Sequence, residues 1–443
     1  MKKLKYALIQ PLTGGVVFAA ENAFGHPAEY ILSYPGLDSP TYKKDGSIKS
    51  VGNEYHFLEY LKKKDRLPLY LQFEHGMFDK PEKVTLKTSE AYKKEWNGEL
   101  PEVDLIAAVP VCSGLSATNT VDHGKKDSAK NDNLKFITEY VLNELKPKVY
   151  IFENAPKLYN PPGSFVRDYL NEVAENAGYS VTYVRTDTCL HHNIQNRRRT
   201  FAIFWKWLDG QKMPPPEIFG ENVQEKTLVD YLNKIPKWAS QNKDENKEKV
   251  KNNLEYQFIK SLYGKKWREV IDKHVRFKSF ILQNNLLDDF LVFCENHKNN
   301  SGYASTKRAY EHASYKLSLG KGFMDRTLFY LSNDKPPTVY HRVTDSSMHP
   351  TEDRLLTMRE YMHLMGIPHD FEYLHDWKSF SSVIGQNVPV KTFEHWLSEC
   401  KRVLEDWPTL RKKFPSKDQD LLKKNNDTFY FFDNLDPKRS HYG

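Results

Sequence analysis

The first half of the chain alternates short apolar runs with stretches in which apolar residues recur at helical spacing. Residues 6–9, 30–32 and 69–73 are apolar runs of strand length, whereas Leu134 and Ile137 begin a helical repeat that Pro147 ends. Strands that alternate with helices in this way are typical of a mainly parallel sheet covered by helices on both faces. The pattern therefore predicts an α/β fold.

This alternation stops near residue 205. Consecutive prolines at 214–216 mark the boundary, and a basic and aromatic stretch containing Lys265, Lys266 and Arg268 follows. We therefore expect a catalytic domain made of residues 1–205 and 346–443, and a smaller, irregular domain made of residues 206–345. A charge run with interleaved aromatic residues is usually an amphipathic surface, but it also suits contact with nucleic acid.

The segment around Thr357 specifies a helix by its own residues. Thr357 is suited to cap the first turn, Glu360 stands three residues later to complete a capping box, and Gly366 and Pro368 follow to end the helix. We expect a packing helix, in which Arg359 and Glu360 hold the domain together rather than perform chemistry.

Composition narrows the class of protein without defining it. The chain has 443 residues, 39% of them hydrophobic, and a formal net charge of +7, which permits a polyanionic partner without requiring one. It contains no apolar window of about 18 residues, and its four cysteines form no Cys-x-x-Cys pair. We expect a cytoplasmic protein of a bacterial or phage-infected bacterial cell, a monomer that needs neither membrane nor metal.

Candidate chemistry lies at the ends of two predicted strands. Cys112 follows the apolar run 103–111, and Glu153 directly follows the run 149–152. Taken singly, such a cysteine is more often an inert buried thiol and such a glutamate is more often solvated. Both nevertheless emerge at the carboxyl ends of strands, which is where open α/β sheets bind ligands.

Further motifs follow these two residues in a fixed order along the chain. After Pro110 and Cys112 come Glu153-Asn154, then Gln195-Asn196-Arg197-Arg198-Arg199, then Arg354 to Glu360, and finally Gly385-Gln386-Asn387-Val388-Pro389. This order resembles the cytosine-5 DNA methyltransferase family over residues 1–205 and 336–395. The resemblance implies a Rossmann-like, mainly parallel sheet for the catalytic domain and a target-recognition role for residues 206–345.

The resemblance also implies catalytic roles, which the chemistry of cytosine explains. Cytosine C5 is a poor nucleophile, and a thiolate that adds to C6 activates it for alkylation. Cys112 would supply that thiolate, and Glu153 would stabilise the charge that develops at N3. Arg199 would hold the base through O2, while Arg197 would brace the site and lower the pKa of the thiol.

By the same resemblance the methyl donor is S-adenosylmethionine. The residues implied for its site are Thr13, Gly14, Gly15, Ser33, Tyr34, Pro110, Leu134, Gln386, Asn387 and Val388. The chain departs from the family here, because Gln10-Pro11-Leu12-Thr13-Gly14-Gly15 replaces the usual Phe-x-Gly-x-Gly-Gly. The acidic ribose ligand is also missing from residues 33–36, and Asp38 is the nearest acid along the chain.

Double-stranded DNA is the implied partner, and its target base must be flipped out of the duplex at a cost of roughly a few kcal/mol. The residues implied for DNA contact are Ser113, Ser116, Gln195, Lys265, Lys266 and Arg268. A closing loop is expected over residues 113–130.

Three alternatives stay open. The altered donor loop suits a related pyrimidine C5 alkyltransferase with a modified sulfonium donor or a modified base. A catalytically silent DNA-binding relative is disfavoured because Cys112, Glu153 and Arg199 are all present. An RNA-modifying relative is the third.

Overall fold

The chain folds as two compact units, residues 1–224 with 365–443 and residues 225–364. The computed structural model describes residues 3–79, 81–115, 129–160, 163–195, 197–220, 227–236, 243–271, 275–297, 303–321, 325, 327–331, 346–372, 384–385, 387–407, 409–410 and 427–432. The predicted boundaries at 205 and 346 therefore differ from those of the compact units, since residues 206–224 lie in the first unit and residues 346–364 in the second.

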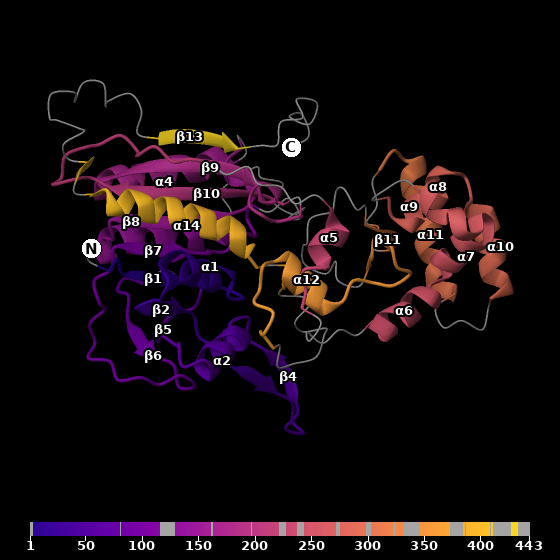
Figure 1. Ribbon diagram of the computed structural model, residues 1–443, viewed down its shortest axis with the longest axis horizontal. Coiled ribbons are helices and arrows are strands. Elements are labelled where there is room, and N and C mark those ends of the chain that lie inside the picture. The colour runs from indigo at the N-terminus through magenta and orange to yellow at the C-terminus, as the bar shows by residue number, and fades with distance from the viewer. Residues whose placement is uncertain are drawn as a thin grey trace. The chain divides into compact units, whose positions relative to one another are not determined.

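The first unit is built on one large sheet (Figure 1). Among the described residues its strand order is β13-β9-β10-β8-β7-β1-β2-β5-β6. The strands are β1 (Tyr6–Ile9), β2 (Tyr30–Ser33), β5 (Leu69–Phe73), β6 (Leu86–Thr88), β7 (Leu105–Ala108), β8 (Val149–Asn154), β9 (Tyr179–Asp187), β10 (Arg198–Lys206) and β13 (Asp427–Phe432). The central strands β5, β2, β1, β7 and β8 pair in parallel, whereas β10 is antiparallel to both β8 and β9.

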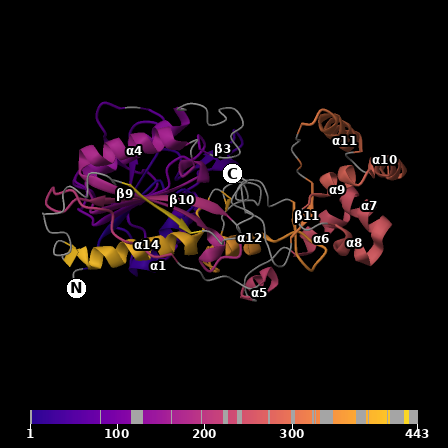
Figure 2. The same cartoon turned by 90° about the horizontal axis from the view of Figure 1, so that it is seen from above.

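Helices cover both faces of this sheet, as the alternating pattern predicts. Figure 2 shows α4 on one face, with α1 and α14 on the other. The helices of this unit are α1 (Gly15–Phe24), α2 (Tyr55–Lys63), α3 (Asp132–Tyr140), α4 (Ser164–Ala177) and α14 (Val390–Glu405). Gly25 and Gly178 end α1 and α4 with φ values of 76° and 80°, a left-handed conformation that favours glycine.

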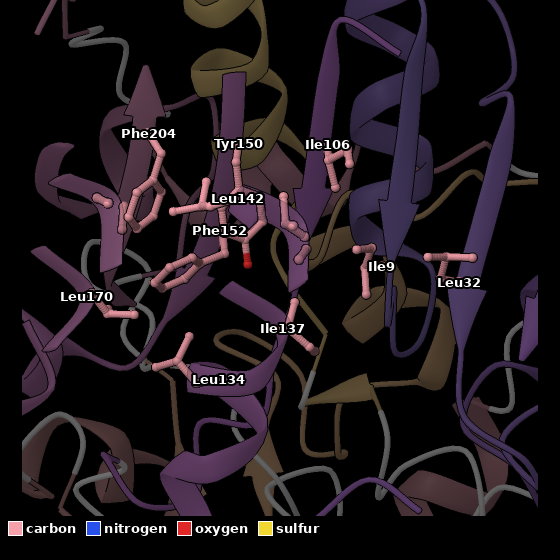
Figure 3. Close-up of a cluster of buried hydrophobic side chains, with 14 of the residues drawn as sticks. Ile9, Leu32, Ile106, Leu134, Ile137, Leu142, Tyr150, Phe152, Leu170 and Phe204 are labelled. Carbon is pink, nitrogen blue, oxygen red and sulfur yellow. The ribbon is translucent and has the colours of Figure 1, made fainter. Parts of the chain in front are cut away.

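The core on the α3 and α4 side of the sheet is apolar and tightly filled. Side chains of β1, β2, β7, β8 and β10 meet those of α3 and α4 there (Figure 3). Its labelled members are Ile9, Leu32, Ile106, Leu134, Ile137, Leu142, Tyr150, Phe152, Leu170 and Phe204. Burial of this apolar surface fixes the strand ends, because a shift in register would expose it to water.

The second unit is largely helical in its described part. It contains α5 (Leu228–Leu232), α6 (Lys243–Lys251), α7 (Leu254–Tyr263), α8 (Trp267–Val270), α9 (Phe277–Gln283), α10 (Leu287–Asn296), α11 (Tyr303–Ser318), the paired strands β11 (Phe329–Tyr330) and β12 (Ser347–Met348), and α12 (Met358–Leu364). A separate apolar cluster that includes Phe258, Trp267 and Phe290 forms its core.

The capping box predicted for α12 is present. The Glu360 backbone N–H donates to Thr357 Oγ1 at 3.2 Å, and the Thr357 N–H donates to Glu360 Oε2 at 2.7 Å. Glu360 also pairs with Arg354, whose two terminal nitrogens each lie 2.8 Å from one carboxylate oxygen. This buried pair agrees with the expectation that Glu360 holds the fold together.

The α/β prediction is confirmed, with additions that the sequence pattern did not indicate. These are the edge strands β6 and β13, and a small hairpin of β3 (Pro40–Tyr42) and β4 (Ile48–Val51). In the described ranges every helix is too short or too polar to span a lipid bilayer.

Candidate active site

Cys112 and Glu153 lie at the same edge of the sheet. Strands β7 and β8 pair in parallel with Ala108 opposite Phe152, so the chain leaves β7 beside the end of β8. Glu153 directly follows Phe152 and is 5% exposed, whereas Cys112 is exposed. The Glu153 carboxylate is close enough to raise the pKa of the Cys112 thiol.

Arg199 reaches this carboxylate from the opposite strand. Because β10 runs antiparallel to β8 with Phe201 opposite Glu153, the first residues of β10 lie beside the last residues of β8. Arg199 Nε forms an ion pair with Glu153 Oε1 at 2.6 Å. An arginine near the nucleophile thus faces the residue expected to act on the base.

Arg197 is buried, 2% exposed, and joins this run to the late turn around Asn387. Its Nη1 donates to Gly385 O at 2.8 Å and its Nη2 donates to Asn387 O at 3.0 Å. Burial lowers the pKa of Arg197 to about 9, and nearby Arg199 lowers it too, while Glu153 and Cys112 act in the opposite direction. The group is still a cation at neutral pH, and its two hydrogen bonds tie the residues before β10 to the late turn. Its role in the site stays a prediction.

The thiol of Cys112 is held mainly in its neutral form. Cys112 is exposed as a residue, but neighbouring protein atoms partly desolvate its thiol. This burial raises the pKa of the thiol above its ordinary value, and Glu153 raises it further, whereas Arg199 and Arg197 lower it. Arg197 therefore acts in the predicted direction, but burial outweighs it.

The loop between β1 and α1 is shaped by its backbone. Gln10, Leu12 and Gly14 have positive φ values of 50°, 52° and 91°. Leu12 occupies the position where the family has glycine, and it adopts the left-handed conformation that glycine favours. The loop therefore takes a glycine-type turn although the glycine is missing.

This loop is clamped by the late turn. The Gly15 N–H donates to Asn387 Oδ1 at 2.8 Å. A Cβ atom at Gly15 would lie only 2.2 Å from Val388 O and 2.4 Å from Asn387 Oδ1, so only glycine fits. Gly15, Asn387, Val388 and Arg197 are thus brought together from distant parts of the chain.

Unsatisfied polar atoms in the same loop leave a place for a polar ligand. Among the described residues, buried Gln10 Oε1 and Thr13 Oγ1 have no hydrogen-bond partner. Buried polar groups are nearly always satisfied in native proteins, and a ligand is a common partner when the protein offers none. The loop therefore fits a donor such as S-adenosylmethionine, with its several hydrogen-bonding groups.

The side chain of Glu54, the residue before α2, contacts the end of β2, and the sequence did not point it out. Ser33 Oγ donates to Glu54 Oε1 at 2.6 Å, and Tyr70 donates to Glu54 Oε2 at 2.8 Å. Burial raises the pKa of Glu54 to about 8, and Asp38 raises it as well, while the two hydroxyl groups lower it. Glu54 lies 21 residues from Ser33 in the sequence, and no local pattern marks it.

For the other predicted site residues, the structure gives burial and a few contacts within the protein. Leu134 is fully buried in the core, Pro110 is buried, and Gln195 is fully buried with its side-chain amide donating to Met365 Sδ at 3.2 Å. The predicted donor and DNA contacts of these residues stay predictions. Ser113 is exposed, and Ser116 and Gln386 lie outside the described residues.

The predicted DNA-binding residues of the second unit differ from one another. Lys265 and Lys266 are exposed. Arg268 instead pairs with Asp353, with Nη2 2.6 Å from Oδ1, and donates to Thr351 O at 3.1 Å. The two lysines are therefore better placed than Arg268 to meet a polyanion.

No group of three or more His, Cys, Asp or Glu residues suited to a metal occurs in the described ranges. The first unit thus has an open, mainly parallel sheet with a glycine-type first loop, a Rossmann-like arrangement. The family model for C-5 cytosine-specific DNA methylase matches residues 77–402, and the chain belongs to this family. S-adenosylmethionine is the methyl donor of the family.

Individual relatives are distant. The type II methyltransferase M.AgeI of Thalassovita gelatinovora is 33% identical over 116 residues, 26% of each chain. A Methanocaldococcus jannaschii protein named "Putative type II methyltransferase M.MjaORF1200P" is 22% identical over 298 residues, 65% of this chain and 63% of its own. The solved structure of the Entamoeba histolytica methyltransferase EhMeth is 12% identical, covers 91% of this chain and 99% of its own, and has a TM-score of 0.49. The chain thus spans less than two thirds of both curated relatives.

Proposed function

We propose that this protein transfers a methyl group from S-adenosylmethionine to C5 of a flipped-out cytosine in duplex DNA through a covalent Cys112 adduct. The observation that carries the proposal is the convergence of Cys112, Glu153 and Arg199 at adjoining strand ends, where Arg199 Nε lies 2.6 Å from Glu153 Oε1. Glu153, Arg197 and Arg199 all act there on the pKa of the Cys112 thiol. A thiol, a carboxyl group and guanidinium groups are the set that activation of a pyrimidine ring requires.

The residues would act in a fixed order. The Cys112 thiolate forms a bond to C6, and the electron pair displaced into the ring is stabilised by a proton that Glu153 holds at N3. Arg199, which pairs with Glu153 in the free protein, would donate to the base carbonyl O2 once the base enters. When bound, the donor supplies an electrophilic methyl group, which C5 attacks.

Release then restores the protein. A general base removes the proton from C5 of the methylated cytosine. The electron pair re-forms the C5–C6 double bond, and the Cys112 sulfur leaves as the thiolate. The raised pKa of the Cys112 thiol means that the free protein rests largely in the unreactive thiol form. The thiolate forms when the target cytosine is in place: the thiol proton passes to the Glu153 carboxylate, which then holds it at N3.

The donor loop supports the ordinary donor over a modified one. Although Leu12 replaces glycine, its φ of 52° gives the loop the turn that glycine would provide. The Gly15 N–H donates to Asn387 Oδ1, which holds the donor loop close to the late turn. The donor loop therefore differs from the family in its side chains but keeps the family's backbone turn. This backbone remains suited to S-adenosylmethionine.

We further propose that the second unit recognises the target sequence. Its exposed Lys265 and Lys266 lie in the short turn directly before α8 and suit contact with phosphates. Replacing both with glutamine should reduce the slope of log binding constant against log salt by roughly 0.9 for each lost phosphate contact. Arg268→Gln is the comparison, because its pairing with Asp353 predicts a smaller effect on the slope.

Trapping on modified DNA tests the covalent step. Duplex DNA that contains 5-fluorocytosine and is incubated with S-adenosylmethionine should form a denaturation-resistant adduct with the native protein, because fluorine cannot leave C5 as a cation. Cys112→Ala should bind the same DNA and form no adduct. Cys189→Ala is the matched control and should form the adduct normally, and equal trapping by Cys112→Ala would overturn the assignment.

A further inference from the structure

Asn133 connects the nucleophile loop with the loops around the donor site. It is the second residue of α3 and is 1% exposed. Its Oδ1 accepts a hydrogen bond from the Val111 N–H at 2.9 Å, directly before Cys112. Its Nδ2 donates to the Tyr34 hydroxyl at 3.1 Å and to the Met77 carbonyl at 3.2 Å.

These partners lie beyond the carboxyl ends of neighbouring strands. Val111 follows β7, Tyr34 follows β2 and Met77 follows β5. Met77 in turn accepts from Gln10, the first residue after β1, with Nε2 3.5 Å from Sδ. In the sheet these strands stand in the order β7-β1-β2-β5. The Asn133 side chain therefore ties together the loops after β7, β2 and β5, and Met77 links them to the loop after β1.

The amide is suited to this task because it offers a donor and an acceptor at once. The Val111 N–H lies past the last paired residue of β7 and has no ladder partner, so Asn133 Oδ1 satisfies a group that burial would otherwise leave unpaired. Tyr34 is 2% exposed and packs against Phe73 with ring centroids 4.9 Å apart. A movement of Tyr34 is therefore passed to Asn133 rather than absorbed by solvent.

We infer that Asn133 is a positioning residue that makes the placement of Cys112 depend on whether the donor site is filled. A donor that contacts the β1 and β2 loops shifts the Gln10 and Tyr34 side chains, and the Asn133 amide passes this shift to the Val111 N–H. Coupling of this kind is reciprocal, so a correctly placed Cys112 also favours donor binding. The inference rests on the proposed function, since it requires that Cys112 add to the base.

Exchange of hydrogen at C5 isolates this coupling from methyl transfer. When the thiolate adds to C6 and solvent donates a proton to C5, reversal releases the original C5 hydrogen to water. The rate of tritium release from C5-labelled duplex DNA thus reports Cys112 addition without a methyl donor. We would measure it with and without saturating S-adenosylhomocysteine, which fills the donor site but carries no methyl group to transfer.

In the native protein, the bound analogue should change the exchange rate by roughly fivefold or more, as expected when a buried hydrogen bond is remade. In Asn133→Ala the ratio of rates with and without analogue should approach one. Tyr34→Phe, which removes one of the two acceptors of Nδ2 and leaves the hydrogen bond to Val111 in place, should also bring the ratio toward one. Asn133→Asp keeps the acceptor for Val111 and replaces the donor, so it should behave like Tyr34→Phe.

Asn143→Ala, at an exposed asparagine beyond α3, is the matched control and should keep the native ratio. An unchanged ratio in Asn133→Ala, or a native ratio of one, overturns the inference and leaves the proposed function standing. Equal loss of exchange with and without analogue would show a purely structural role and overturn it as well. Absence of exchange in the native protein would overturn the proposed function and this inference together.

Discussion

The two halves of the reactive edge of the sheet are built in different ways. At the ends of β7, β8 and β10, a carboxylate and two guanidinium groups shift the pKa of the Cys112 thiol. At the ends of β1 and β2, backbone shape and neutral hydrogen bonds dominate, with Gly15 held by Asn387 and Leu12 in a left-handed turn. The nucleophile half depends on charge and the donor half depends on fit.

This difference explains where the sequence departs from its family. A charged group that acts on a reacting atom has few replacements, and Cys112, Glu153 and Arg199 keep the family's residue types. A backbone turn can be made by more than one side chain if the surroundings hold it, as they do at Leu12. Substitutions in the two halves should therefore fail in different ways.

Glu153→Gln should give the largest effect, on the nucleophile half. The amide keeps the shape of the carboxyl group and loses its ionisable proton, so methyl transfer should slow by roughly 10²–10⁴-fold while DNA and donor binding change little. Single-turnover transfer of labelled methyl to DNA measures this rate. Glu144→Gln, at an exposed position, should keep the native rate, and near-native turnover in Glu153→Gln would reassign the carboxylate as structural.

Glu54→Gln should alter stability on the donor half. The pKa of Glu54 is raised from 4.5 to about 8, so its contribution to stability is complete below pH 4.5 and is lost as the pH rises through 8. Glutamine lacks this dependence, and the variant should gain on the order of a few kcal/mol relative to the native protein between these limits. Urea unfolding at a series of pH values, with exposed Glu82→Gln for comparison, measures the gain, and parallel curves for all three proteins would contradict the assignment.

Gly15→Ala should weaken donor binding while sparing the nucleophile. Its Cβ would lie 2.2 Å from Val388 O, so the clamp must open, and we expect the donor dissociation constant to rise by roughly tenfold or more. Calorimetric titration with S-adenosylhomocysteine measures this constant. Leu12→Gly is the matched change, and it should bind at least as tightly because glycine adopts that turn freely. The reverse ranking of the two variants would show that the loop does not hold the donor.

The pH dependence of Cys112 alkylation should show the smallest of these effects. Glu153 raises the pKa of the thiol and Arg199 lowers it. In the free protein the midpoint for alkylation of Cys112 by iodoacetamide should therefore move to lower pH in Glu153→Gln and to higher pH in Arg199→Gln, each by roughly one unit. Peptide mass spectrometry separates Cys112 from the other cysteines. The change Gly15→Ala should leave this midpoint in place, and shifts of the same sign in both charge variants would be inconsistent with the described cluster.

Local patterns were sufficient for the elements and for the groups at their ends. Apolar runs predict β1, β2, β5, β7 and β8, and Cys112 and Glu153 follow two of these directly. The contacts that complete the edge could not be predicted, because each joins segments whose sequences carry no mark of one another. Glu54 meets Ser33, Arg197 meets Gly385, and Asn133 meets Tyr34 only after the strands have been ordered. The helical content of the second unit was missed because its apolar residues are interrupted by many charges.

The clamp on the donor loop also sets a condition on biosynthesis. The hydrogen bond from Gly15 to Asn387 spans 372 positions, with the second unit synthesised between its two ends. While the ribosome is still producing that unit, Cys112, Glu153 and Arg199 have already been made, but the turn that fixes the first loop has not. Shape complementarity for the donor is therefore acquired last, and a nascent or truncated chain that ends before residue 387 would carry a nucleophile without a clamped donor cradle.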